Sequence, residues 1–298
     1  MDLSRLLRVI EVDQVDDDAF VGHSPQERSR AVYGGQFLAQ ALMAASATVE
    51  AGRVPHSLHA YFVRSGAALQ PIDYRVERIR DGRSFSHRSV VASQDGREVF
   101  RQVQSFQVPA DGLRHQEPID IEQDVDPSTM TPYRDWVREY SDNQDHEWFA
   151  EHLPVDIRFQ DAPLPESRAP FGGIVRIWMK LLGEVPTSEP TTHAALLAWM
   201  SDKTISDMTM YPHGRTWTDT GYDILSLDHA MHFFEPSRAD RWTLFTHETP
   251  ATGGGRGLAR GDLVTLDGRR VGSVVQEALL VTPDEPDSLE GRPVTGAS

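Results

Sequence analysis

The chain of 298 residues contains no cysteine. This absence excludes a disulfide scaffold, cysteine-ligated zinc, an iron–sulfur cluster and a cysteine nucleophile. No run of about 18 apolar residues occurs, so we expect no membrane span. The first twenty residues are acidic and lack the hydrophobic centre of a secretion signal, so we expect a cytoplasmic protein.

Positive charge is also scarce, with 29 lysines and arginines against 45 aspartates and glutamates and a formal net charge of −16. A nucleic-acid-binding surface would be basic, so we expect no nucleic-acid partner. A few local arginines could still hold an anionic ligand. A chain of this length sits near the size at which one hydrophobic core divides into two, so two domains are expected.

Several catalytic motifs are missing. The chain has no G-x-S-x-G elbow, no H-E-x-x-H zinc motif and no phosphate-binding P-loop. Two pairs, His56-x-x-His59 and His229-x-x-His232, have a spacing that is common among metal ligands. Both lie in runs typical of strands, where residues i and i+3 point to opposite faces. We therefore predict no metal site.

The first 110 residues predict one helix followed by a meander of strands. The Ala-rich segment 34–49 has helical spacing, and Asp95-Gly96 is a strong hairpin signal between two extended runs. One helix followed by long strands predicts an α+β fold and argues against a βαβ alternation. The strands are expected at 55–64, 72–79, 85–93 and 99–108.

The later part of the chain repeats this pattern. A helix is expected at 191–210, followed by strands at 225–234, 242–249, 257–266 and 271–281. A shift of 172 residues gives seven identities over the 25 positions 84–108, among them Arg88 on Arg260 and Gln104 on Gln276, and it also places Phe62 on Phe234. We interpret this as an internal duplication.

The duplication sets the expected domain boundaries. We predict a first copy over residues 1–110 and a second copy over 153–285. An acidic linker over 111–152 separates them and contains a short helix from Tyr133 to Leu153. Residues 286–298 form a C-terminal tail.

An ordered set of segments resembles the type II acyl-CoA thioesterases, which carry two hot-dog units in one chain. Each segment alone is a weak signal, whereas their order along residues 30–280 is specific. The segments in the first copy are VYGGQ at 32–36, HSLHAYF at 56–62 and RDGRSFS at 80–86. Those in the second copy are SD at 201–202, PHG at 212–214, LDHAM at 227–231, RGLARG at 256–261 and VQE at 275–277.

The resemblance implies a helix wrapped by an antiparallel sheet, twice, and hydrolysis of fatty acyl-CoA to a free fatty acid and CoA without a cofactor. It also implies a catalytic trio of Asp202, Ser226 and Gln276, so the copy over 153–285 is expected to carry the active site. Ser226 stands where the family usually has Thr, so it keeps the hydroxyl but loses the methyl group that stiffens χ1. We expect this difference to affect the rate more than the reaction type.

The trio suits activation of water. It includes no imidazole and no thiol, so a covalent acyl-enzyme is not the natural interpretation. The Asp202 carboxylate could accept a proton from water while the hydroxyl and the amide orient that water. Burial on a partly apolar helix stripe would raise the pKa of Asp202 towards working pH.

Substrate contacts are expected from both copies. Gly34 and Gly35 would let the backbone at a helix start approach the thioester oxygen. Arg88, Arg256 and Arg260 are candidates for the CoA phosphates, because the planar guanidinium suits phosphate oxygens. The open edge of a hot-dog sheet favours pairing, so we also expect a homodimer or higher homo-oligomer.

Two other functions stay open at this stage. The first is a hot-dog hydratase that adds water to enoyl-CoA; that chemistry normally uses an Asp–His pair, and no histidine is near Asp202 or Gln276 in sequence. The second is a non-catalytic acyl-CoA-binding protein, which the change to Ser226 keeps open. His56, which the repeat places on Asp228, is expected to be a structural histidine.

Overall fold

The computed structural model describes residues 1–25, 31–119, 125–141, 150–161, 170–217, 219 and 221–281. Strands of the described residues form one continuous antiparallel sheet. Those from the first copy are β1 (Val12–Asp16), β2 (Ala19–Gly22), β3 (Val54–Phe62), β4 (Ile72–Asp81), β5 (Phe85–Gln94) and β6 (Arg97–Gln107). Those from the second copy are β7 (Val155–Phe159), β8 (Val175–Leu181), β9 (Asp223–Ser226), β10 (Asp228–Phe233), β11 (Thr243–Gly253), β12 (Arg256–Thr265) and β13 (Arg270–Val281).

The two copies are arranged alike about the centre of the sheet. The strand order is β1-β2-β4-β5-β6-β3-β10-β13-β12-β11-β8-β7, and β9 pairs with β13 beside this path. The central strands β3 and β10 pair antiparallel, with His59 opposite Ala230. Outward from this pair each copy presents its strands in corresponding order, so the sheet is a tandem of two similar units.

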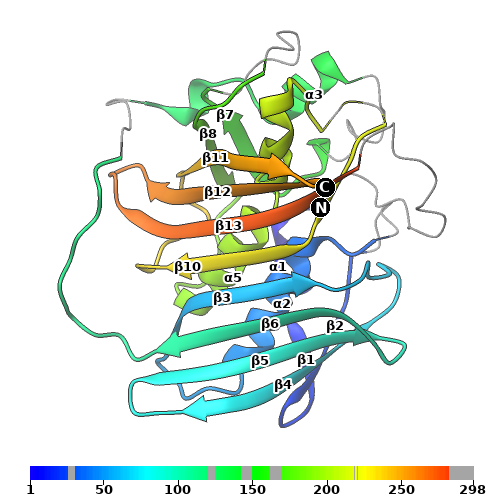
Figure 1. Ribbon diagram of the computed structural model, residues 1–298. Coiled ribbons are helices and arrows are strands. Elements are labelled where there is room, and N and C mark those ends of the chain that lie inside the picture. Colours follow the sequence, from blue (N-terminus) through cyan, green and yellow to red (C-terminus); the bar gives the residue numbers. More distant parts are fainter. Residues whose placement is uncertain are drawn as a thin grey trace.

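Helices cover one face of the sheet (Figure 1). The two central ones are α2 (Gly34–Ser46) and α5 (Pro190–Ser201), which pack against each other. Both are rich in Ala and Leu, and most of their side chains are buried in one hydrophobic core. A helix against an antiparallel sheet therefore occurs twice, the arrangement that the resemblance implies. None of the described helices is long and apolar enough to cross a membrane.

Smaller helices flank this core. The first, α1 (Leu3–Ile10), begins at Asp2, whose side chain accepts a hydrogen bond from the backbone N–H of Arg5. In the predicted linker, η1 (Pro127–Thr129) precedes α3 (Tyr133–Tyr140). The helix expected to run to Leu153 therefore ends at Tyr140, and residues 142–149 lie outside the described residues, as does the predicted tail. The boundaries at 110 and 152 stay predictions.

The second long helix is shorter than the sequence predicts. It ends at Ser201, with Asp202 as its C-cap, and a 3₁₀ helix, η3 (Ser206–His213), follows after a turn. Ser, Thr and Asp side chains compete with the helix for backbone hydrogen bonds. The Ser201 hydroxyl lies 2.9 Å from the Ala198 carbonyl, and the Thr209 hydroxyl donates to the Ser206 carbonyl. A segment rich in these residues therefore ends the helix before Asp202.

The strand expected at 225–234 is two strands. They are separated at Leu227, whose N–H donates to the Glu277 carbonyl. The Asp228 carboxylate accepts from the backbone N–H of Glu277 at 2.7 Å. The Asp228 side chain thus accepts a hydrogen bond that a backbone carbonyl would accept in a regular strand pair, and the strand is interrupted there.

The pairing of β5 with β6 and the corresponding pairing of β12 with β13 differ in register by one residue. Gln104 lies opposite Arg88, whereas Gln276 lies opposite Ala259, so Arg88 is not the counterpart of Arg260. The connection between β12 and β13 is longer than the two-residue Asp95-Gly96 turn, and the register shifts next to Val264. A slip of one residue moves a side chain to the other face of the sheet.

Candidate active site

Three elements bring the polar trio (Asp202, Ser226 and Gln276) together. Asp202 follows the last residue of α5, Ser226 ends β9, and Gln276 lies within β13. The Gln276 amide Nε2 donates to the Ser226 Oγ at 2.7 Å. Both groups interact with the Asp202 carboxyl as hydrogen-bond donors. The structure therefore gathers three side chains that are 24 to 74 residues apart in sequence.

The break between β9 and β10 places Ser226. Ser226 pairs with Ala278, and the Leu227 N–H donates to the Glu277 carbonyl at 2.9 Å. The Asp228 side chain holds the other side of this junction through the Glu277 N–H. These contacts fix the chain next to β13, so the Ser226 hydroxyl lies beside the Gln276 amide.

The start of α2 supplies the opposite wall. A Cβ on Gly34 would lie 2.6 Å from Oδ2 of Asp202, and one on Gly35 would lie 2.5 Å from the Trp199 carbonyl. Only glycine permits this close approach. The Gly35 N–H also interacts with the Asp202 carboxyl, at a helix end where backbone N–H groups favour negative charge. The predicted glycines therefore border the trio, although they come from the first copy.

Burial controls the charge of Asp202. The residue is 4% exposed, and its Oδ1 has no hydrogen-bond partner among the described residues. Burial raises the pKa of Asp202 to about 7. The Gln276 amide, the Lys203 charge, the Gly35 N–H and the Ser226 hydroxyl oppose this rise. A carboxyl with such a pKa can accept and release a proton near neutral pH.

A second buried carboxyl lies close by, which the sequence did not indicate. Asp207 in η3 is 6% exposed, and burial raises its pKa to about 7, with the charge of Asp202 adding to the rise and that of Lys203 opposing it. The Lys203 ammonium lies 4.8 Å from the ring centre of Tyr33. The Tyr33 hydroxyl donates to the Trp199 carbonyl, tying the start of α2 to α5.

His229 is a site residue that the sequence reasoning missed. It is fully buried; its Nδ1 lies 2.5 Å from Oε1 of Gln276 and 4.0 Å from Oδ1 of Asp202. No histidine is near Asp202 or Gln276 in sequence, but the fold brings His229 next to both, so sequence distance does not argue against a hydratase. The available signal was the LDHAM segment, in which the alternation of β10 directs His229 inwards and leaves His232 exposed.

In the first copy, Gln104 is the repeat partner of Gln276. Gln104 in β6 donates to the Ala41 carbonyl in α2 at 2.9 Å and accepts from Gln102. Its role is structural, because it ties β6 to α2. His56 likewise contacts Ser105, with 2.7 Å between Nε2 and Oγ.

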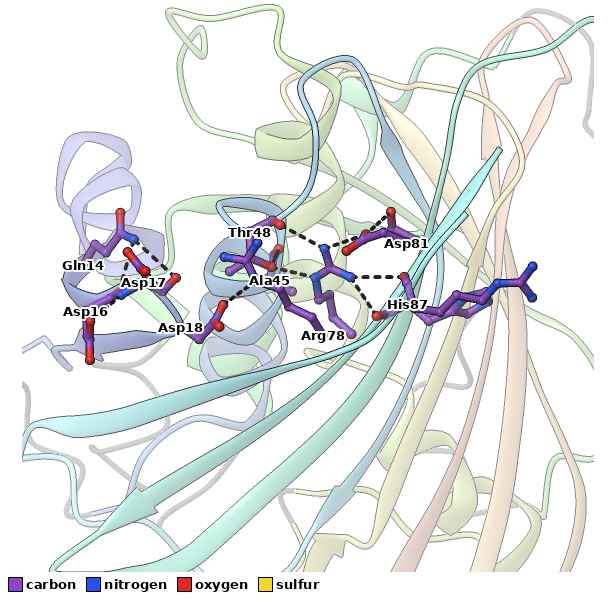
Figure 2. Close-up of polar contacts among 12 residues, drawn as sticks. Gln14, Asp16, Asp17, Asp18, Ala45, Thr48, Arg78, Asp81 and His87 are labelled. Atoms are coloured by element: carbon purple, nitrogen blue, oxygen red, sulfur yellow. Dashed lines mark hydrogen bonds and ion pairs between the residues drawn. The ribbon is translucent and has the colours of Figure 1, made fainter. Parts of the chain in front are cut away.

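Arg88 does not reach the trio, and the geometry does not support its expected phosphate role. It is 1% exposed, and its guanidinium donates to the side chain and carbonyl of Thr48, to the carbonyls of Arg80 and His87, and to Asp81. Figure 2 shows Thr48, Asp81 and His87 close together in the first copy. These bonds use all five N–H donors, so none is left for a phosphate.

The other two predicted arginines lie away from the trio. Arg256 pairs with Glu277 at 2.9 Å, and Arg260 pairs with Glu248 at 2.5 Å. Both arginines are exposed, whereas the intervening Ala259, which lies opposite Gln276, is buried. By strand alternation the two arginines occupy the face opposite Gln276, so the geometry does not support a phosphate contact near the trio.

Comparison with known proteins identifies the family. Residues 23–107 match the acyl-CoA thioesterase N-terminal domain, and residues 124–280 match the acyl-CoA thioesterase C-terminal domain. The chain is 31% identical to acyl-CoA thioesterase 2 of Haemophilus influenzae, over 93% of this chain and 97% of the relative. It is 32% identical to human acyl-coenzyme A thioesterase 8, over 94% of this chain and 90% of the relative.

Solved structures agree with the sequence relatives. The acyl-CoA thioesterase II TesB2 of Mycobacterium marinum superimposes with a TM-score of 0.76 at 29% identity, covering 94% of this chain and 98% of that one. A tesB protein of Mycobacterium avium subspecies paratuberculosis gives a TM-score of 0.78 at 27% identity, covering 94% and 99%. The chain has the α+β double hot-dog fold and belongs to the type II acyl-CoA thioesterase family.

Proposed function

We propose that this protein hydrolyses fatty acyl-CoA thioesters by direct attack of a water molecule that Asp202 activates. The observation that carries the proposal is the convergence of the Asp202 carboxyl, the Ser226 hydroxyl and the Gln276 amide in one buried site. A carboxyl with a pKa of about 7 is half ionised at neutral pH and is therefore suited to general-base catalysis.

The trio and the start of α2 can account for each bond and proton change in the hydrolysis. Water attacks the thioester carbonyl while Asp202 accepts its proton, so a C–O bond forms and an oxyanion develops. Backbone N–H groups at the start of α2, where Gly34 and Gly35 allow close approach, stabilise that oxyanion. The C–S bond then breaks, and the proton on Asp202 transfers to the departing CoA thiolate. Gln276 and Ser226 orient the water.

His229 does not favour the hydratase alternative. Its two ring nitrogens already contact Ser201 and Gln276, and burial lowers its pKa to about 4. A buried histidine engaged at both nitrogens is poorly placed to carry a proton to or from an enoyl substrate. The histidine beside Asp202 therefore has another role.

Thiol release tests the proposal directly. Purified protein is given palmitoyl-CoA with a thiol reagent, and the same protein is given an enoyl-CoA while the enoyl absorbance is followed. We expect thiol release that falls about 100-fold or more in Asp202→Asn. Loss of the enoyl absorbance without thiol release would contradict hydrolysis. Binding of palmitoyl-CoA with no turnover above the Asp202→Asn background would instead favour a binding protein.

The cytoplasmic location and the homodimer or higher homo-oligomer stay part of the proposal. The sheet of the described residues ends at β1 and β7, and the ends of a sheet are consistent with further association. Sedimentation of the purified chain would decide the oligomeric state, and a monomer at micromolar concentration would contradict this part.

A further inference from the structure

A buried chain of hydrogen bonds leads from α5 through β10 and β13 to the trio. Ser201 Oγ lies 3.1 Å from Nε2 of His229, and Nδ1 of His229 lies 2.5 Å from Oε1 of Gln276. The chain continues from Nε2 of Gln276 to Ser226 Oγ at 2.7 Å. Ser201, His229 and Gln276 are each 0% exposed, so water does not compete for these contacts.

Each hydrogen bond along this chain is donated in the same direction, from Ser201 towards Asp202. The Gln276 carbonyl can only accept, so Nδ1 of His229 carries the ring proton. Since burial keeps the imidazole neutral, with its pKa lowered to about 4, Nε2 is then an acceptor. The Ser201 hydroxyl can serve Nε2 or the Ala198 carbonyl, and a buried Nε2 lone pair would otherwise be unsatisfied.

The same direction of donation continues from Gln276 through Ser226 to the Asp202 carboxyl. The Gln276 NH₂ group faces Ser226, whose oxygen accepts and whose own hydrogen is left to donate to Asp202. A flipped amide would turn its carbonyl oxygen towards that carboxylate, where two acceptors repel each other. The orientation of the Gln276 amide therefore decides whether Asp202 is surrounded by donors.

The first copy shows the same amide without a histidine beside it. Leu58 lies opposite Gln104 in the pairing of β3 with β6. In the second copy Ala230 lies opposite Val275, so His229 occupies the position beside Gln276. With the apolar Leu58 as its neighbour, the Gln104 amide donates to the backbone of α2 instead.

We infer that His229 is a positioning residue for the hydrolysis, which holds the Gln276 carbonyl and so directs the amide NH₂ towards Ser226 and Asp202. The inference rests on the proposed function. Ser201 supports it by donating to the far side of the ring. His229 thus acts through Gln276 and does not itself exchange protons with the substrate.

Two substitutions at one position separate this role from simple packing. His229→Leu introduces the residue of the first copy and removes the donor to Gln276. His229→Asn places an amide N–H near the position of Nδ1. We expect kcat of the Leu variant to fall by about 10-fold to 100-fold with KM within about twofold. The Asn variant should recover most of that loss.

The pH profile gives a second readout. Loss of the oriented donors should raise the pKa of Asp202, so the acidic limb of kcat/KM should move to higher pH in His229→Leu and stay near the original position in His229→Asn. In the described part of the chain, the other titratable groups that face Asp202 are Lys203 in the turn after α5, Asp207 in η3 and Tyr33 at the start of α2. These stay unchanged in both variants.

A double-mutant cycle tests whether His229 acts through Gln276. Gln276→Ala combined with His229→Leu should be no slower than Gln276→Ala alone. His193→Leu is the control for removing a buried histidine, since His193 contacts only the backbone of Thr187 and Ala239 within hydrogen-bond distance in the described part of the chain. It should lower the melting temperature without lowering kcat.

The outcomes that overturn the inference are distinct from those that overturn the function. An unchanged kcat in folded His229→Leu, or additive losses in the double variant, would refute the positioning role. Full activity of Gln276→Ala would instead refute the proposed site. If His229→Leu does not fold, Ser201→Ala carries the test: the acidic limb should again move upwards, and an unchanged limb and kcat would refute the inference.

Discussion

The raised pKa of Asp202 has a consequence for stability that can be measured without substrate. A carboxyl with a pKa of 3.8 when unfolded and about 7 when folded binds its proton more tightly in the folded state. The free energy of unfolding therefore falls as pH rises from about 4 to about 7, because the folded protein must ionise a buried group. Replacing Asp202 by neutral Asn removes this dependence.

The size of the destabilisation follows from the difference between the folded and unfolded pKa values of Asp202. Each pKa unit corresponds to about 1.4 kcal/mol, so ionised Asp202 destabilises the protein by about 4 kcal/mol well above pH 7. Between pH 5 and pH 8 the change is about 2–3 kcal/mol, or about 5 °C in melting temperature for a chain of this size. Asp202→Asn should therefore gain stability over the parent by this amount as pH rises from 5 to 8.

Thermal denaturation of both proteins at pH 5 and pH 8 is the assay. Asp207 titrates in both, so the comparison cancels its contribution apart from its coupling to Asp202. Exposed Asp73→Asn serves as the control and should change stability by less than about 0.5 kcal/mol at either pH. An Asp202→Asn advantage that is the same at pH 5 and pH 8 would refute a buried carboxyl with a raised pKa.

Substitutions at three residues of the site, with one control in the first copy, test separate parts of the site. Gln276→Ala should lower kcat by about 100-fold, whereas Gln104→Ala, its partner in the repeat, should leave kcat within about twofold in the same thiol-release assay; equal effects would contradict the assignment. Asp207→Asn removes a like charge near Asp202, so the pKa of Asp202 should fall and the acidic limb of kcat/KM should move to lower pH, and a limb that stays in place would show that the two carboxyls do not interact. Ser226→Thr should retain or raise activity, because the added methyl group restricts χ1 and keeps the hydroxyl; an inactive Thr variant would count against the role of Ser226.

Local patterns in the sequence predict much of the fold. The alternation of apolar residues places most of the long strands, and Asp95-Gly96 forms the expected hairpin, with φ angles of +49° and +72°. These features depend on neighbouring residues, which is why a single sequence reveals them. The resemblance then supplies the trio, whose members the structure brings together.

The missed features depend on contacts between distant segments. The end of α5 at Ser201 and the break at Leu227 lie beside side chains that bond backbone groups, as Thr209 does with the Ser206 carbonyl and Asp228 with the Glu277 N–H. Arg88 is buried because its strand is one residue out of register with that of Arg260. His229 reaches the trio only because β10 pairs with β13. Sequence spacing carries no record of these pairings.

Isotope labelling tests the central claim, direct attack by water, most directly. A single turnover of palmitoyl-CoA by excess enzyme in H₂¹⁸O should give palmitate that carries one ¹⁸O atom, while the peptide that contains Asp202 stays unlabelled. Mass spectrometry of the product and of the digested enzyme measures both. Unlabelled palmitate in the first turnover, with ¹⁸O in Asp202, would show that the carboxylate attacks the thioester itself and would contradict the account.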